Sequence, residues 1–206
     1  MKNILCYGDS NTFGYNPQNG LRLDKNSRWS SILADKLENE YNVIEAGLCD
    51  RTAFVDNSKG HDYSAQRHYP DFLSKFRDLS IIIIALGTND LQFLYEINEE
   101  IVKKGLTSLI KLSKEFTDNI IIVSPVKLNN EVLKGYFKIQ FDEKSVEKSK
   151  KIGAIYKKIC TDECCIYFDI NEFAQPSNHD GLHYEPNTHR HIAQKLYELI
   201  QNSNQH

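Results

Sequence analysis

The stretch that most constrains the fold is Ser80–Leu86, "SIIIIAL", which is apolar at every position after its first residue. A strand with one face in solvent alternates apolar and polar residues, whereas a strand covered by helices on both faces is apolar throughout. The run therefore predicts a central strand of a parallel sheet. It contains the longest unbroken apolar run of the chain, which is far shorter than the ~20 residues that a membrane-spanning helix needs, so we expect no membrane partner.

Four further segments have the composition of strands, and segments with helical spacing of apolar residues separate them. The five predicted strands are Asn3–Tyr7, Asn42–Ala46, Ser80–Leu86, Asn119–Ser124 and Cys164–Phe168. Helical spacing is found in residues 27–41, 97–116, 143–160 and 187–201. Strands that alternate with helices predict a doubly wound α/β domain, a three-layer α/β/α sandwich with right-handed crossovers.

No linker, internal repeat or low-complexity tract divides the chain, and 206 residues suit one domain. We therefore expect a single domain over residues 1–206, with a frayed tail at 201–206. Residues 127–142, "KLNNEVLKGYFKIQFD", fit no regular element. They are candidates to cover a pocket or to pack against a second subunit, so the sequence leaves a homo-oligomer open.

Charge and cysteine usage argue against several classes of function. The net charge of -3 gives no electrostatic basis for binding nucleic acid or an anionic membrane surface. Residues 1–20 carry polar or charged side chains every few positions, unlike the apolar core of a signal peptide, so we expect a cytoplasmic protein. The five cysteines are irregularly spaced, and we interpret them as reduced thiols rather than zinc ligands.

The histidines near the C-terminus raise one metal hypothesis. His179 and His183 form an H-x-x-x-H pair, but Gly181 between them disfavours the helix on which such a pair binds zinc. We therefore expect no metal site. His189 and His191 flank the start of the last predicted helix, and we expect both to face solvent.

Small and polar residues follow the predicted strands at the edge where open parallel sheets bind their ligands. The motif "GDSN" follows the first strand, "GLCDRT" follows the second and "GTND" follows the third, while "NHDGLHYEP" comes beyond the fifth, across a loop. One such turn carries little weight. Four of them at one edge of a sheet predict a functional site.

The chemistry that these motifs can perform together is acyl transfer. A serine hydroxyl is a weak nucleophile until a base removes its proton, and we expect Ser10 to be exposed because it stands at a strand end. His183 is the candidate base, and Asp180, three residues earlier in a turn, can fix its tautomer. Asp9 is a poor candidate for this acid, since adjacent residues in an extended segment point in opposite directions.

Candidate oxyanion-hole donors lie at the same edge of the sheet. They are the backbone N–H of Ser10, the backbone N–H of Gly47 and the side-chain amide of Asn89. Taken alone, Gly47 is an ordinary turn residue, and Asn89 with Asp90 is an ordinary helix cap. Catalysis is favoured because the motifs converge.

Polar residues beside these motifs are weaker candidates for substrate binding: Asp9, Asn11, Arg51 and Asp90. Two interpretations of Arg51 are open, since it can orient the turn around Gly47 or contact a substrate, and the structural role is favoured. Trp29 is expected to be a core residue rather than an aromatic platform.

Together the four blocks resemble those of the SGNH, or GDSL-like, hydrolases, a family named for a serine, a glycine, an asparagine and a histidine. "GDSNTFGY", "EAGLCDRTAF", "LGTND" and "DGLHYEPNTHRHIA" occur in the family's order and span almost the whole chain. With "RW", they are most similar to the arylesterase and acyltransferase branch. That branch commonly has a small or polar residue and a glycine where Cys49 and Asp50 stand, and a tryptophan in place of Phe13, which bears on the substrate more than on the reaction.

The resemblance implies a flavodoxin-like sandwich with five parallel strands. It implies Ser10 as the nucleophile, His183 as the base and Asp180 as its partner, with the oxyanion hole formed by the Ser10 and Gly47 N–H groups and the Asn89 side chain. Neither a metal nor an organic cofactor is implied.

We therefore expect a serine esterase that hydrolyses short-chain carboxylic esters through an acyl-enzyme, with transfer to another alcohol as a further activity. A carbohydrate O-deacetylase of the same family is the main alternative, so the expected partner is a small-molecule ester or an acetylated carbohydrate. Two non-hydrolase alternatives are a catalytically silent ligand-binding protein of this fold and a nucleotide-binding module. The latter is disfavoured because the chain has neither a G-x-G-x-x-G nor a P-loop pattern.

Overall fold

A five-stranded parallel sheet forms the centre of the protein in the computed structural model, which describes residues 1–203. The strands are β1 (Lys2–Gly8), β2 (Tyr41–Gly47), β3 (Leu79–Ala85), β4 (Ile120–Val123) and β5 (Ile166–Phe168). Their order, β2-β1-β3-β4-β5, and their parallel pairing confirm the predicted flavodoxin-like sheet. From β1 the chain adds β2 on one side and then β3, β4 and β5 on the other, so the strand order switches between β1 and β3, which is where open sheets of this kind bind ligands.

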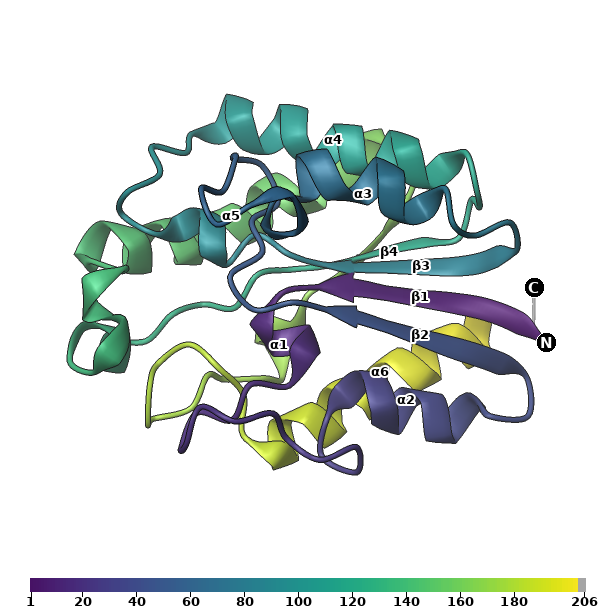
Figure 1. Cartoon of the computed structure of the whole chain (residues 1–206), viewed down its shortest axis with the longest axis horizontal. Helices are drawn as coiled ribbons and strands as arrows, with labels where there is room; N and C mark the ends of the chain where they lie inside the picture. The colour runs from purple at the N-terminus through teal and green to yellow at the C-terminus, as the bar shows by residue number, and fades with distance from the viewer. Residues whose placement is uncertain (204–206) are drawn as a thin grey trace.

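Helices cover both faces of the sheet (Figure 1). The α-helices are α1 (Ser10–Phe13), α2 (Trp29–Leu37), α3 (Ala65–Leu73), α4 (Glu99–Lys114), α5 (Glu143–Asp162) and α6 (Pro186–Ser203). Helices α2 and α6 lie on one face, and α3, α4 and α5 lie on the other. Short 3-10 helices are η1 (His61–Tyr63), η2 (Asn89–Leu91), η3 (Asn130–Leu133), η4 (Tyr136–Ile139) and η5 (Ile170–Glu172).

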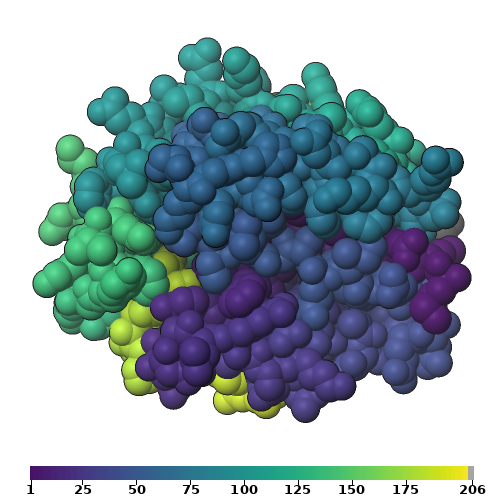
Figure 2. Space-filling view, viewed as in Figure 1, coloured from purple at the N-terminus to yellow at the C-terminus, as the bar shows by residue number. Residues whose placement is uncertain are grey.

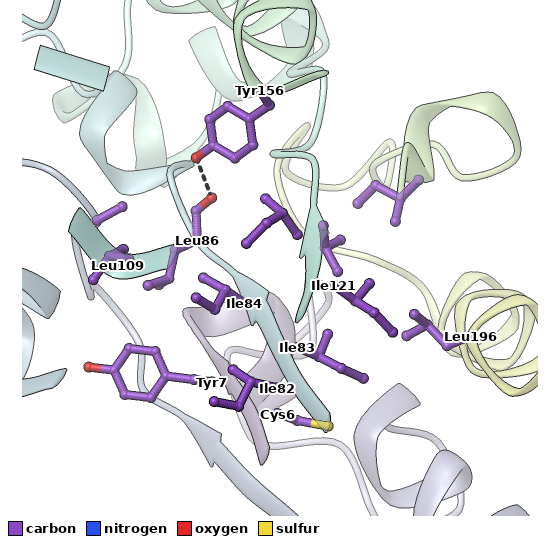
Figure 3. Packing of buried hydrophobic residues seen from close by; sticks show 14 of the residues in the cluster. Cys6, Tyr7, Ile82, Ile83, Ile84, Leu86, Leu109, Ile121, Tyr156 and Leu196 are labelled. Carbon is purple, nitrogen blue, oxygen red and sulfur yellow. Dashed lines mark hydrogen bonds between the residues drawn. The ribbon is translucent and has the colours of Figure 1, made fainter. Parts of the chain in front are cut away.

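The isoleucine run of β3 is buried on both faces, as its composition predicts. Ile82, Ile83 and Ile84 are at most 1% exposed. Figure 3 shows Ile82 and Ile84 on one face of the strand and Ile83 on the other, toward Leu196 of α6. Each such side chain stabilises the fold by roughly 1.5–3 kcal/mol relative to an exposed one. The two helical layers are therefore held to the sheet through its central strand.

The helices depart from the sequence prediction at two places. Helix α3 was not predicted, and it contains Pro70, a residue that normally removes a backbone hydrogen bond inside a helix. Residues 201–203, the first part of the expected tail, continue α6, whereas 204–206 lie outside the described residues. Across residues 1–203, the helices are too short or too polar for any of them to cross a membrane.

Segments that are far apart in the sequence meet at one end of the molecule. Figure 2 shows the purple N-terminal segment, the green segment around residue 140 and the yellow-green C-terminal segment side by side. A backbone hydrogen bond of 3.1 Å from the Asn129 N–H to the Gly181 carbonyl ties the latter two together. This is the end of the sheet at which the strands' carboxyl termini lie.

Candidate active site

Ser10 is the first residue of the short helix α1, which begins two residues after the end of β1 at Gly8. Asp9 caps this helix, since its carboxylate accepts a hydrogen bond of 3.0 Å from the Asn11 N–H. Gly8 allows the turn to close this tightly, because a Cβ at this position would lie 2.0 Å from the Thr12 Oγ1. The local sequence therefore fixes the serine at the carboxyl edge of the sheet.

The Ser10 hydroxyl meets an imidazole from the other end of the chain. His183 Nε2 lies 2.8 Å from Ser10 Oγ, and His183 Nδ1 lies 2.7 Å from Asp180 Oδ2. The His183 and Asp180 side chains are only 2% and 8% exposed. The structure thus brings together the three residues predicted as nucleophile, base and orienting acid.

The Asp180 carboxylate is fixed by the turn that carries it. Its Oδ1 accepts hydrogen bonds of 2.9 Å from the N–H groups of Leu182 and His183, and Gly181 adopts the left-handed φ of 71° that the turn requires. Burial raises the pKa of Asp180, but the hydrogen bonds and the charge of His183 outweigh burial and hold this pKa below its usual value. The carboxylate is therefore ionised at neutral pH and favours the His183 tautomer with its proton on Nδ1.

Two aromatic rings pack against the His183 imidazole. The Tyr15 ring stacks on it with a centroid distance of 4.1 Å and an interplanar angle of 29°. The Phe137 ring, from η4, lies 5.3 Å away. The segment 127–142, whose role the sequence left open, therefore packs against the site. Sequence reasoning did not assign Tyr15 to the site, because its only signal is an aromatic residue one position after Gly14.

A cleft of about 280 Å³ opens in front of Ser10. One wall is aromatic and the other is polar, and at the polar rim the Lys59 Nζ lies 2.6 Å from Asp50 Oδ2. The residues that line the cleft are Ser10, Tyr15, Cys49, Asp50, Lys59, Asn89, Tyr136, Phe137, Gln140, Leu182 and His183. Its size suits a small ligand that has both apolar and hydrogen-bonding groups.

Asn89 lies at the start of η2, beyond the end of β3, and its side chain lines the cleft beside Ser10. Its Nδ2 donates a hydrogen bond of 3.1 Å to the Arg51 carbonyl, and its Oδ1 accepts one of 3.3 Å from Gln92 Nε2. These two contacts fix which end of the amide is the donor. One Nδ2 hydrogen is left to point toward a ligand.

Gly47, which the sequence suggests as a backbone donor, does not line the cleft. It ends β2 opposite Gly8, and a Cβ there would lie 2.2 Å from the Phe13 N, so its glycine is explained by the close approach of α1. Asp50 lines the cleft instead. It has a φ of 64°, and the Arg51 N–H donates to the Leu48 carbonyl at 3.3 Å, as in a turn that normally has glycine at its third position. The sequence signal was that Asp50 stands where the resembled branch commonly has glycine.

Arg51 and Asp90 lie behind the cleft rather than in it. Arg51 is 4% exposed, and its guanidinium donates to backbone carbonyls. Asp90 accepts hydrogen bonds from the N–H groups of residues 53–55 at 2.7, 2.7 and 3.2 Å. Burial raises the pKa of Asp90 to about 6, against the lowering by these N–H groups. Both residues shape the loop after β2 and do not line the cleft, which for Arg51 is the structural role that the sequence favoured and for Asp90 differs from the expected contact with a substrate.

Asp9 and Asn11 are also committed to the protein. Burial raises the pKa of Asp9 to about 7, although the hydrogen bonds from the Asn11 N–H and Thr88 lower it. Asn11 Nδ2 donates to the Leu182 carbonyl at 3.3 Å and so joins the serine turn to the histidine turn. Asp9 and Asn11 therefore bind other parts of the protein and do not line the cleft, which differs from their expected contact with a substrate.

The remaining histidines differ from one another in burial. His189 is fully buried and accepts a hydrogen bond of 3.3 Å from the Trp29 N–H, so the prediction that it faces solvent is wrong. Burial lowers the pKa of His189 to about 3. His191 and His179 are exposed. Among residues 1–203, no three His, Cys, Asp or Glu side chains are placed to hold a metal ion.

Comparison with known proteins assigns the chain to a family. The model of the GDSL-like lipase/acylhydrolase family matches residues 6–191. The chain therefore belongs to this family, which is also known as the SGNH hydrolases. A comparison with curated proteins gave no match.

Several solved structures share the fold over nearly the full length of both chains. A carbohydrate acetylesterase family member from Sinorhizobium meliloti is 29% identical, with a TM-score of 0.85 over 98% of each chain. An aryl esterase from M. smegmatis is 24% identical, with a TM-score of 0.89 over 98% of this chain and 99% of that one. Est24, a carbohydrate acetylesterase from Sinorhizobium meliloti, is 23% identical, with a TM-score of 0.87 over 98% of this chain and 99% of that one.

Proposed function

We propose that the protein is a serine esterase that hydrolyses small carboxylic esters through an acyl-enzyme. The observation that carries this proposal is the chain of short contacts from Ser10 Oγ through the His183 imidazole to Asp180. His183 Nε2 takes the hydroxyl proton as Ser10 Oγ attacks the ester carbonyl carbon. The imidazolium then gives this proton to the departing alkoxide. A water molecule, deprotonated in turn by His183, attacks the acyl carbon. The bond to Ser10 Oγ then breaks, and the imidazolium returns the proton to Oγ as the acid leaves.

Negative charge on the tetrahedral intermediate needs preorganised donors. We assign these to the Ser10 N–H, the Asn89 Nδ2 and the N–H of Asp50. The first two keep the roles expected from the sequence. Asp50 replaces Gly47 as the second backbone donor, because Asp50 lines the cleft beside Ser10 and Gly47 does not.

The form of the cleft supports an ester with a short acyl group. Tyr15 and Phe137 pack against the His183 imidazole and form an apolar wall of the cleft, against which a short acyl group can bind. Transfer of the acyl group to an acceptor alcohol needs only that the alcohol reach the acyl-enzyme before water does.

A carbohydrate O-deacetylase is the second candidate. It is favoured by the polar rim, where Asp50, Lys59 and Gln140 can bind sugar hydroxyls beside the exposed ring of Tyr136. The 29% identity to a carbohydrate acetylesterase family member adds support.

The test is hydrolysis of 4-nitrophenyl esters of increasing acyl length and of acetylated sugars, with Ser10→Ala as the blank. We expect activity highest with acetyl or propionyl groups and abolished in Ser10→Ala, and stoichiometric labelling of the wild type by a fluorophosphonate. A protein that is not labelled and turns over none of these esters would be a silent binding protein. Retention of activity in Ser10→Ala would end the nucleophile assignment.

A further inference from the structure

Arg51 is a buried arginine that follows directly after Asp50, one of the proposed oxyanion-hole donors. Its guanidinium donates to backbone carbonyls. Its Nη1 donates to the carbonyls of Gly8 at 2.9 Å and Ala46 at 2.6 Å, and its Nε donates to the Asp62 carbonyl at 3.1 Å. The guanidinium carbon lies 4.2 Å from the centre of the Tyr7 ring. Among the described residues it forms no ion pair with a carboxylate, although buried charges are normally paired.

These contacts reach the elements that carry each proposed donor. Gly8 ends β1 two residues before Ser10, and Ala46 lies at the end of β2 just before the turn that carries Asp50. The Arg51 backbone closes that turn through its N–H to the Leu48 carbonyl at 3.3 Å. Its own carbonyl accepts the hydrogen bond of 3.1 Å from Asn89 Nδ2. One residue therefore contacts the supports of all three donors.

We propose that Arg51 is the positioning residue of the oxyanion hole. The planar guanidinium locks the ends of β1 and β2 at a fixed separation, and the Arg51 carbonyl orients the Asn89 amide. This inference rests on the proposed esterase function. It assigns Arg51 no contact with the substrate, because the side chain is 4% exposed and does not line the cleft.

A positioning role has a kinetic signature that a merely structural role lacks. Donors that are displaced by a fraction of an ångström still admit the neutral ester, but they stabilise the charged tetrahedral intermediate less well. Arg51→Met should therefore lower kcat by about 10- to 100-fold with little change in KM. Arg51→Lys should lower kcat less, because a lysine ammonium keeps the positive charge and can donate hydrogen bonds. It cannot reproduce the fixed planar arrangement of the guanidinium donors.

A trifluoromethyl ketone measures the same effect without turnover, since its adduct with the serine carries the negative oxygen. Its inhibition constant should rise by the same factor by which kcat/KM falls in Arg51→Met and in Arg51→Lys. Arg28→Met is the matched control. Arg28 is also buried, but its guanidinium donates to Glu45 and to the Leu23 carbonyl. This control should lower Tm and change the inhibition constant, per folded molecule, by less than about threefold.

The experiment separates failure of this inference from failure of the esterase proposal. Activity that survives Ser10→Ala would overturn the esterase itself. Activity that is lost in Ser10→Ala but equal to wild type in folded Arg51→Met would overturn only the role of Arg51. A rise in KM with unchanged kcat, or an inhibition constant that does not follow kcat/KM, would do the same. If Arg51→Met does not fold, the test is made with Arg51→Lys, in which the fall in kcat/KM and the rise in the inhibition constant should agree.

Discussion

The Ser10 hydroxyl and the His183 imidazole lie within hydrogen-bond distance, 2.8 Å, although 173 positions separate the two residues in the sequence. Ser10 is fixed by the end of β1, and His183 is fixed by the turn before α6. The Asn11 side chain joins the two turns through the Leu182 carbonyl. The proposed nucleophile and its base therefore belong to one rigid unit that does not need a ligand to assemble it.

The orienting role of Asp180 predicts a large effect of Asp180→Asn. An asparagine amide can donate to Nδ1, which favours the tautomer whose Nε2 carries the proton and cannot accept one from Ser10. We expect kcat to fall on the order of 10³- to 10⁴-fold. Steady-state kinetics on a 4-nitrophenyl ester measure this loss, with circular dichroism as the control for folding. A loss of less than tenfold would contradict the role of Asp180.

The same assignment predicts the acid limb of the pH profile. His183 must be neutral to accept the serine proton, so kcat/KM should fall as pH decreases and the imidazole binds a proton. Asp180, whose pKa is held below its usual value, stays ionised over this range and should add no second step. The measurement is kcat/KM between about pH 5 and pH 8. An unchanging value across that range would be incompatible with His183 as the base.

Asn89 tests the oxyanion hole directly. Asn89→Ala removes an oriented side-chain donor and should lower kcat by roughly 10²- to 10³-fold with a small effect on KM. Asn89→Asp is the shape-matched comparison, and it should be at least as impaired because it places a negative charge beside the developing oxyanion. Wild-type kcat in either variant, measured on the same ester, would remove Asn89 from the mechanism.

Much of this site could be predicted from the sequence because parallel strands end at a common edge. The run of isoleucines indicated that β3 is a central strand, and the structure places β1 beside it, so the motifs after β1 and β3 are neighbours. The spacing of Asp180 and His183 then supplied an acid and a base that one turn can hold. For these residues, the place in the backbone was enough to predict that they belong to the site.

Other features depend on information that residue types do not carry. The sequence could not show that Asp50, rather than Gly47, lines the cleft. Glycine is the residue expected at a left-handed turn position, and here that position holds an aspartate. The burial of His189 depends on its bond to the Trp29 backbone, 160 residues away. Phe137, which contacts His183, lies in a segment whose apolar residues have no regular spacing. The sequence therefore does not predict which way its side chains face.

Asp9 predicts a measurable dependence of stability on pH. Burial raises its pKa from 3.8 to about 7, so the folded protein binds this proton more tightly than the unfolded chain does. Its stabilising contribution is therefore complete below the unfolded pKa and is lost as pH rises through the folded pKa. Asp9→Asn keeps the helix cap but removes the titration.

The free energy of unfolding in urea should thus fall for the wild type relative to Asp9→Asn as pH rises from 4 toward 7, by about 1.4 kcal/mol per pH unit at most. Because every other ionisable group is shared by the two proteins, the difference between their curves reports the titration of Asp9 together with its charge interaction with Asp90. A difference that does not change with pH would show that the Asp9 carboxyl has an ordinary pKa in the folded state.

Phe137 predicts where substrate selectivity is set. Its ring packs against both His183 and Tyr15, with centroid distances of 5.3 and 6.0 Å, on the wall contributed by η4. Phe137→Ala should enlarge the cleft on this side, so that kcat/KM for butyryl and hexanoyl esters rises relative to that for acetyl esters. Tyr136→Ala is the matched control, because Tyr136 is the adjacent residue and is 72% exposed, and its ring packs edge-on against Phe137 rather than against His183. It should leave the acyl-length preference unchanged while weakening any selectivity for sugar acetates. If the ratio of hexanoyl to acetyl activity is the same in Phe137→Ala as in the wild type, the acyl group does not bind against η4, and the opposite wall at Cys49 becomes the place to look for it.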